Sequence, residues 1–334
     1  MLTNATLTLS TLLPALALGL ACLAPAPSNT ANAPADATLS SSPTLSESSA
    51  DPVALDPQAS DSALVEVRRL DRQGRTSSGE VGVLAPQEHM RRAAIYHGNR
   101  AFEEARAHWT ALIARHPRDA NVPAAIFGIG RSLYQERRYD EALPFFERLG
   151  RDFIDQKEGR EGYYYVAATV LRLGRPAEAA ARYSEYAVKF PAGERVEAAY
   201  LNAVDSWREA GRNGDAIDWI GRTRERYRHK VADTNALFAR LRLDVAASDW
   251  PSAVRAADEL RAKQLPAVFQ LTGAQTFQSE VAYLRAFSLE NSKQRDQAAA
   301  AYQSITDRAS SYYGWLATER LRKLGDAARR AADA

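Results

Sequence analysis

The sequence predicts an all-α fold, a solenoid of about six helix-turn-helix repeats followed by a C-terminal capping helix. Two observations predict it. Alanines recur at a constant interval of 37 residues, at Ala105, Ala142, Ala179, Ala216 and Ala253. A large apolar residue follows the first four of them at a spacing of four, at Trp109, Phe146, Tyr183 and Ile220. A fixed period between about 20 and 50 residues marks a repeat architecture, and alanine is small enough to stand where two helices touch.

The second repeat, Pro123–Phe153, shows two apolar stripes separated by a polar turn. Residues in the first stripe recur at spacings of three and four, as on one face of a helix: Ile126, Ile129, Gly130 and Leu133. The second stripe, after the turn, contains Ala142, Phe145, Phe146 and Leu149. The segment therefore reads as two helices that pack against each other through these stripes.

This repeat resembles the tetratricopeptide repeat. Its glycine, aromatic turn residue, small residue and bulky residue are matched by Gly130, Tyr139, Ala142 and Phe146. The resemblance implies a right-handed α-solenoid. A proline usually ends the second helix, because proline cannot continue one. Pro117 and Pro191 match this pattern, whereas Ile154 and Arg228 stand where the pattern has proline.

The other repeats follow in register. The first spans about Pro86 to Pro117 and has Ala93 in place of the glycine. The third, fourth and fifth contain residues 163–191, 198–220 and 236–260. In the sixth, residues 281–305, Ala298 follows Ala253 after 45 residues, which predicts a longer loop over Leu265–Gln278.

The N-terminal part predicts export. Residues 7–26 contain an apolar run of signal-peptide length, too short for a comfortable membrane span. We expect a signal peptide or lipoprotein signal over residues 1–37, a disordered Ser/Pro/Ala-rich linker over 38–85, and the repeat domain over 86–334. Such a linker buries too little apolar surface to offset the entropy of ordering it. The expected location is the periplasm.

Cys22 is the chain's single cysteine and follows Leu20 and Ala21. This context resembles a lipoprotein cleavage site, at which the thiol is acylated and anchors the protein to the outer membrane. Gly19 departs from the pattern, since leucine or a similar residue is usual there. The alternative is cleavage after Ala35–Ala37, which would remove Cys22. Both alternatives stay open, and in both the repeats contain no cysteine.

The charge is distributed unevenly along the chain. No Lys or Arg precedes Arg68, and the residues before it carry −6; because the whole chain carries +2, the remainder carries +8. A basic helical body tolerates an acidic partner, although most of these arginines fit a solvated surface. The aromatic residues stand at packing positions, and an exported protein rarely meets nucleic acid, so no nucleic-acid partner is expected.

No catalytic or metal-binding motif is present. His89 and His97 are eight residues apart on one expected helix, as are His108 and His116 on the next, and about 12 Å of helix separates residues so spaced. Nucleotide-binding loops and nucleophile elbows are also absent. We therefore expect no metal, no cofactor and no enzymatic activity.

The C-terminal segment Ser310–Gly325 resembles a signature of soluble lytic murein transglycosylases, near the end of their helical region. The matching residues are Tyr312, Tyr313, Gly314, Leu316, Ala317, Arg320 and Leu321. In that family an exported helical superhelix precedes a lysozyme-like domain and contacts the cell-wall polymer. The catalytic "E-S-x-F … G-L-M-Q" pattern is missing here, so no catalytic residue carries over. The alternative is that the segment is only a polar helix that caps the end of the solenoid.

These observations predict an exported, non-catalytic scaffold that binds cell-wall polymer or envelope proteins, equivalent to the helical region of a lytic transglycosylase without its enzyme domain. The alternative is a free-standing tetratricopeptide adaptor or lipoprotein for envelope protein assembly. By the resemblance to the tetratricopeptide repeat, the first helices line a concave binding face. The residues expected there are Phe127, Arg131, Tyr134, Tyr164, Leu171, Asp205, Arg208, Phe238 and Arg242.

Overall fold

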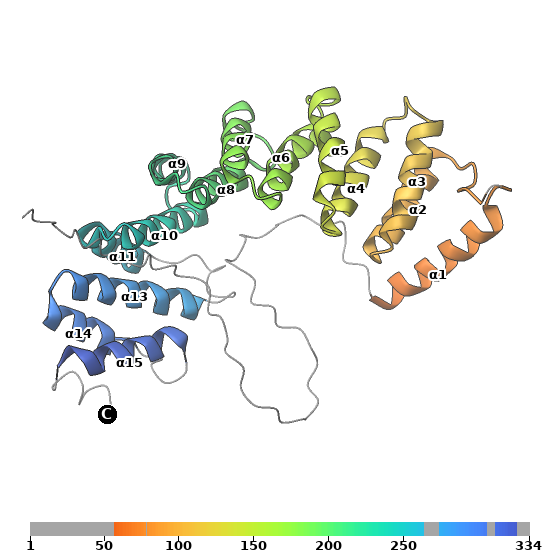
Figure 1. The fold of residues 1–334 in the computed structure, drawn as a ribbon. Coiled ribbons are helices and arrows are strands. Elements are labelled where there is room, and N and C mark those ends of the chain that lie inside the picture. Colours follow the sequence, from red (N-terminus) through yellow and green to blue (C-terminus); the bar gives the residue numbers. More distant parts are fainter. Residues whose placement is uncertain (1–56, 78, 264–273, 306–310, 326–334) are drawn as a thin grey trace, which may run out of the picture. The chain divides into compact units, whose positions relative to one another are not determined.

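The computed structural model describes residues 57–77, 79–263, 274–305 and 311–325 (Figure 1). Within these residues the secondary structure is helical and contains no strand, as predicted. The helices are α1 Pro57–Gly74, α2 Pro86–Gly98, α3 Phe102–Arg115, α4 Val122–Gln135, α5 Tyr139–Asp152, α6 Lys157–Arg172, α7 Pro176–Lys189, α8 Val196–Glu209, α9 Asn213–Arg226, α10 Val231–Ala246, α11 Trp250–Ala262, α13 Ala274–Asn291, α14 Arg295–Gln303 and α15 Tyr312–Leu324.

Six helix pairs account for the predicted repeats: α2/α3, α4/α5, α6/α7, α8/α9, α10/α11 and α13/α14. The two helices of each pair pack against each other, the second helix of each of the first five pairs packs against the first helix of the next pair, and α15 packs against α13 and α14. The chain is therefore a series of tetratricopeptide-like hairpins closed by a final helix. None of the described helices has both the length and the apolarity that crossing a bilayer requires.

The periodic alanines lie where the helices touch, as predicted. All six, Ala298 included, have no exposed surface. Gly130 serves the same purpose, since a Cβ atom at this position would lie 2.8 Å from the ring of Phe146, which is itself fully buried. A larger side chain at any of these places would push the paired helices apart.

The turn inside each hairpin repeats with the same period. Its residue with positive φ is Arg100, Arg137, Gly174, Gly211, Ser248 or Lys293, with φ between 58° and 74°. The next residue donates its N–H to a carbonyl near the end of the first helix, for example Arg138 to Leu133 at 2.9 Å. This left-handed ending satisfies carbonyls that the helix leaves free.

The second helices end at equivalent places with or without proline. Pro117 and Pro191 each lie two residues beyond a helix end, and so do Ile154 and Arg228. Where proline is missing, the backbone still closes the last turn, as when Phe153 N–H donates to the Leu149 carbonyl at 3.0 Å.

The apolar core runs through all of the hairpins. One cluster of buried residues extends from Val67 to Leu243, a second from Leu237 to Val281, and a third from Tyr283 to Leu321. Leu284 and Phe287 pack against both of the last two clusters and join them. Neighbouring hairpins thus share apolar surface, which no single hairpin could bury alone.

The structure corrects two predicted boundaries. Residues 57–74 form α1, so they do not belong to a disordered linker; the composition of 38–85 concealed the helix, whose Val67 is only 1% exposed. Residues 274–278 belong to α13, so the predicted loop over Leu265–Gln278 is too long at that end. Residues 1–37 with Cys22, and residues 264–273, lie outside the described part of the chain.

Candidate functional site

The predicted binding residues lie on the first helices of four consecutive hairpins: α4, α6, α8 and α10. Contacts join α4 to α6, α8 to α10, and α10 to α13. Most of these side chains are half-buried, and Asp205 is exposed. We call this row of side chains on successive first helices the first-helix strip. That the strip is concave stays a prediction.

In the N-terminal half of the strip, the aromatic residues mainly hold helices together. The Phe127 ring lies 5.4 Å from that of Tyr165, and the Tyr134 ring lies 5.7 Å from it. Tyr164 packs edge-on against Tyr183, and its hydroxyl accepts a hydrogen bond from Asn202 Nδ2 at 2.7 Å. Leu171 packs against the core in the same way, while Arg131 is half-buried.

The C-terminal half of the strip carries charged groups and aromatic rings. Arg242 on α10 stacks over Phe238, with its Cζ 4.2 Å from the ring centre, and donates to Glu280 on α13 at 2.7 Å. Arg208 pairs with Asp205 on α8 at 2.8 Å. These groups form a polar row that crosses three consecutive first helices.

Asp205 shows that the protein surrounds this row without covering it. Its side chain is 53% exposed. Desolvation nevertheless raises the pKa of the carboxyl, although the positive charges of Arg208 and Arg242 act to lower it. The exposure of the carboxylate leaves it accessible to a partner.

The residues of the C-terminal signature divide into two faces of α15. Gly314, Ala317 and Leu321 are buried against α13 and α14, and Tyr313, Leu316 and Arg320 are half-buried. Tyr312 is 67% exposed, and its neighbour Trp315, which sequence reasoning did not select, is 56% exposed. The buried face makes α15 a capping helix. On the exposed face the Tyr312 ring packs edge-on against that of Tyr313 at 5.3 Å and lies 6.5 Å from that of Trp315.

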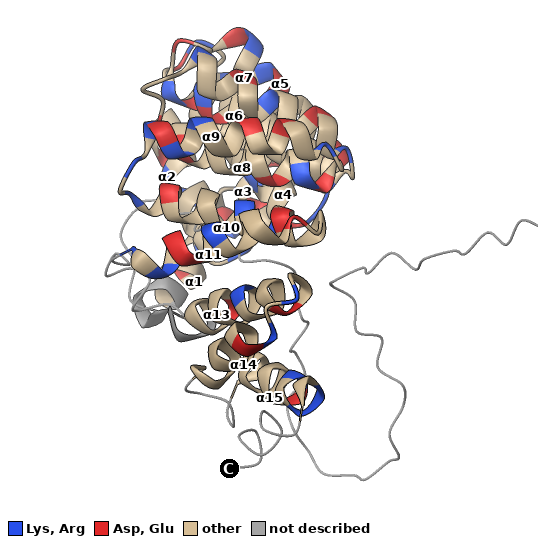
Figure 2. Ribbon diagram, turned by 90° about the vertical axis from the view of Figure 1, so that its left-hand side faces the viewer, with Lys and Arg blue, Asp and Glu red and all other residues tan. Residues whose placement is uncertain are grey.

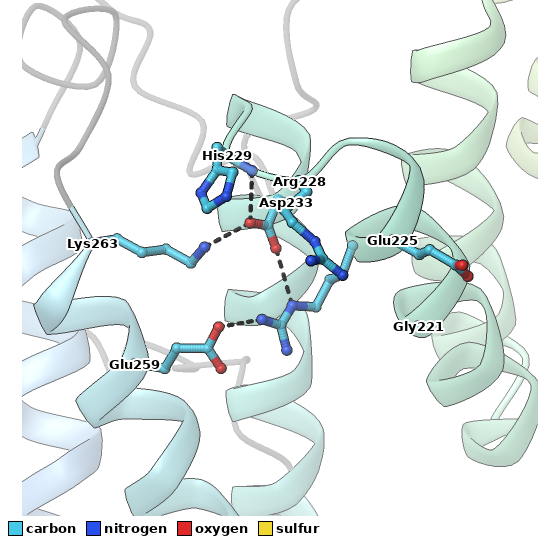
Figure 3. Close-up of a pocket in the computed structure, with 8 residues that line it drawn as sticks. Gly221, Glu225, Arg228, His229, Asp233, Glu259 and Lys263 are labelled. Carbon is cyan, nitrogen blue, oxygen red and sulfur yellow. Dashed lines mark hydrogen bonds and ion pairs between the residues drawn. The ribbon is translucent and has the colours of Figure 1, made fainter.

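A separate hollow of about 550 Å³ lies between α9, α10 and α11 (Figure 3). Asp233, with its side chain 4% exposed, accepts hydrogen bonds there from Lys263 at 2.6 Å and Arg224 at 3.0 Å. Burial would raise the pKa of this carboxyl, but the hydrogen bonds from Lys263 and Arg224 outweigh it and hold the pKa below its usual range. Arg224 also pairs with Glu259.

A buried polar network joins α1 to the first hairpin. Asp71 of α1 accepts from Tyr96 Oη at 2.5 Å and lies 2.9 Å from His108 Nε2; Arg92 also donates to it. His108 Nδ1 in turn lies 3.1 Å from His89 Nδ1. The spacing of histidines along single helices did not predict this contact. His89 and His108 come together because α2 and α3 pack against each other.

The network fixes the tautomers of both histidines. With His108 Nε2–H donating to Asp71, His108 Nδ1 must accept from His89 Nδ1–H. Protonating His108 at Nδ1 removes the acceptor of the bond from His89. Protonating His89 leaves that bond in place but puts a proton on the buried Nε2, which has no hydrogen-bond partner. Among the described residues, no group of three His, Cys, Asp or Glu side chains is placed to hold a metal ion.

We expect the docking of α1 to weaken in acid. Burial lowers the pKa of His89 from 6.5 to about 4, and burial also lowers the pKa of His108 despite Asp71. Between pH 6.5 and about 4 the folded chain therefore binds fewer protons than the unfolded chain, so stability falls as the pH falls through this window. Other charges face the rings from all three helices and the following loop: Arg92 and Glu88 on α2, Glu104 and Arg115 on α3, Arg68 on α1, and His116.

Urea unfolding measured across this window checks the prediction. Replacement His89→Leu should flatten the dependence of the unfolding midpoint on pH. The control His229→Gln, at an exposed histidine, should leave it unchanged. Equal pH dependence in wild type and His89→Leu would contradict the expectation.

The family model of the tetratricopeptide repeat matches residues 280–311, in agreement with the helical hairpin in this part of the chain. A solved tetratricopeptide repeat protein from Parabacteroides merdae shares 11% identity, with 74% of this chain and 97% of that chain covered and a TM-score of 0.49. No curated protein matches the chain.

Two further solved structures are similar. PilW, described as a widely conserved type IV pilus biogenesis factor, shares 16% identity over 69% of this chain and 97% of that one, with a TM-score of 0.46. The TPR2AB domain of yeast Sti1, solved in complex with pHSP90, shares 13% identity over 75% and 98% of the two chains, with a TM-score of 0.30. The transglycosylase-like signature of α15 stays a sequence resemblance.

Proposed function

We propose that this chain is an exported, non-catalytic helical adaptor that binds extended segments of envelope proteins along the first-helix strip. The observation that carries the proposal is the polar row of Asp205, Arg208, Arg242 and Glu280 beside the ring of Phe238. It crosses α8, α10 and α13, so a single extended segment could contact several hairpins.

The chemistry of the row suits a peptide. The Arg208 and Arg242 guanidinium groups offer planar sets of donors to carbonyl and carboxylate oxygens. The Asp205 carboxylate can accept hydrogen bonds from the backbone N–H groups of such a segment. Because the row alternates in charge, it favours a segment of mixed polarity over a purely basic or acidic one.

Export rests on the apolar run at residues 7–26, which supports a periplasmic location with either a cleaved signal or a lipid anchor at Cys22. One observation favours cell-wall polymer as a second candidate ligand. Tyr312 and Trp315 present exposed rings on α15, and such rings stack on sugar faces. The transglycosylase-like signature in the same helix points to the same polymer.

Peptides selected from a random phage-displayed library test the first candidate. We expect Asp205→Ala and Arg208→Ala each to weaken the affinity for the selected peptides by about tenfold, or about 1.4 kcal/mol. The matched control is Asp215→Ala, which removes the same kind of ion pair, with Arg212 at 2.8 Å, from the second helix α9. Circular dichroism should show unchanged helicity in all three variants.

Two outcomes decide between the ligands. Selected peptides that bind Asp205→Ala and the control equally well would refute the strip as a peptide site. Co-sedimentation with purified sacculi that is lost in Trp315→Ala, together with unaffected peptide binding, would favour the polymer instead.

A further inference from the structure

The C-terminal end of α9 and the loop to α10 contain an unusual density of positive charge. Residues 221–230 read GRTRERYRHK, with Glu225 as their single acid. Four of the cations, Arg222, Arg226, Arg228 and Lys230, are exposed. We call these four residues the basic edge.

Aromatic rings and a backbone carbonyl, rather than carboxylates, hold three of the four cations of the basic edge, Arg222, Arg226 and Lys230. Arg222 lies 5.1 Å from the ring centre of Trp219, and Lys230 lies 5.9 Å from that of Tyr227. Arg226 lies 5.6 Å from the ring centre of Tyr200 and donates to the Pro191 carbonyl at 2.5 Å. A cation over a ring is positioned, yet its charge stays uncompensated.

This arrangement differs from the pattern elsewhere in the chain. Basic and acidic residues are interspersed over the helices in Figure 2, and exposed arginines commonly pair with an acid three residues away, as Arg69 does with Glu66. In the part of the chain that the structure describes, no carboxylate forms an ion pair with any of the four cations of the basic edge. The negative end of the α9 dipole favours cations in its last turn, but this effect fades beyond that turn and does not explain Arg228 or Lys230.

The hollow beside the basic edge leaves little negative charge to oppose an anion. Its buried acid, Asp233, is already bound by Lys263, Arg224 and the His229 backbone N–H. Glu259 is paired with Arg224. Figure 3 shows the Glu225 side chain pointing away from Asp233 and Lys263. Arg228 and His229 at the rim are exposed.

We propose that the basic edge and the adjoining hollow bind an acidic segment of a partner protein, with carboxylates on the four cations. Charge complementarity favours an anionic partner. The burial of the aromatic rings indicates whether that partner is a nucleic acid or an acidic peptide. Single-stranded nucleic acid binds through bases stacked on open aromatic faces. Here Trp219 and Tyr227 are 7% and 6% exposed beneath their cations, so they are not available to bases. A run of glutamates or aspartates needs no such platform.

Fluorescence anisotropy with a short labelled polyglutamate peptide tests this surface on the full chain at low salt. We expect the double variant Arg228→Ala/Lys230→Ala to weaken binding by about tenfold or more. The matched control is Arg118→Ala/Lys157→Ala, because Arg118 is an exposed cation in an equivalent loop between hairpins and Lys157 begins the first helix α6. Melting curves should be the same for all three proteins.

Three results would overturn the proposal. The first is equal weakening in the control, which would mean diffuse attraction to net charge. The second is peptide binding that survives in the double variant. The third is tighter binding of a single-stranded RNA of matched length, which would reassign the surface to nucleic acid. Asp205→Ala and Arg208→Ala should leave polyglutamate binding intact, so this test and that of the first-helix strip can fail separately.

Discussion

Replacement Gly159→Ala destabilises the protein by on the order of 3 kcal/mol, although alanine is the better helix former. Gly159 lies in the first turn of α6, where a Cβ atom would overlap the Phe153 carbonyl. That obstacle is backbone at the end of the preceding hairpin, so no side-chain rotation relieves it. Gly162 is similarly close-packed, since a Cβ atom at this position would lie 2.5 Å from the Cβ of Leu149. Hairpins two and three would have to separate.

The midpoint of urea unfolding measures this effect. Gly221→Ala is the matched control, because Gly221 is also helical and a Cβ there would meet nothing within 4 Å. That variant should be neutral or more stable, by up to about 1 kcal/mol. If Gly159→Ala and Gly221→Ala behaved alike, the close contact between α5 and α6 would be wrong.

Replacement Asp71→Ala detaches α1 from the first hairpin. It removes the acceptor shared by Arg92, Tyr96 and His108, and leaves a buried guanidinium with Glu88 as its remaining partner. Breaking a buried ion pair in this way costs about 3 kcal/mol or more. We expect the loss to concentrate in α1 and the first hairpin, where the partners of Asp71 lie.

Amide hydrogen exchange separates local from global loss. In Asp71→Ala, residues 57–74 should exchange faster while the amides of α4 and α5 keep their protection. Glu66→Ala on the same helix is the control, because Glu66 is 53% exposed and pairs only with the exposed Arg69; surface pairs of this kind contribute about 1 kcal/mol or less. Unchanged exchange of α1 in Asp71→Ala would show that the network does not hold it.

The periodic features of the fold could be read from the sequence because one kind of contact recurs in each repeat. Ala142 and Gly130 mark the same place within a hairpin, and the 37-residue interval locates its equivalents. Contacts between hairpins carry no such signal. Gly159 and Gly162 follow no interval. The pairing of Asp71 with His108 joins the first repeat to α1, a helix that the composition of residues 38–85 concealed.

That the candidate residues share the first helices could be predicted from the sequence, whereas the packing of each side chain could not. The resemblance placed Tyr164 and Asp205 on the same strip, yet one ring packs among neighbouring tyrosines and the other side chain is exposed. That difference depends on which residues the next hairpin presents, for example Asn202 against Tyr164. The sequence did not indicate the basic edge, because its cations resemble an ordinary solvated run of charge. Only the structure shows the aromatic rings beneath them.

A crystal structure of the chain with a selected peptide shows directly whether the first-helix strip is a peptide-binding site. We expect an extended peptide across α8, α10 and α13, in contact with Asp205, Arg208 and Arg242. A peptide bound to the second helices α9 and α11, with the first-helix strip left untouched, would contradict it.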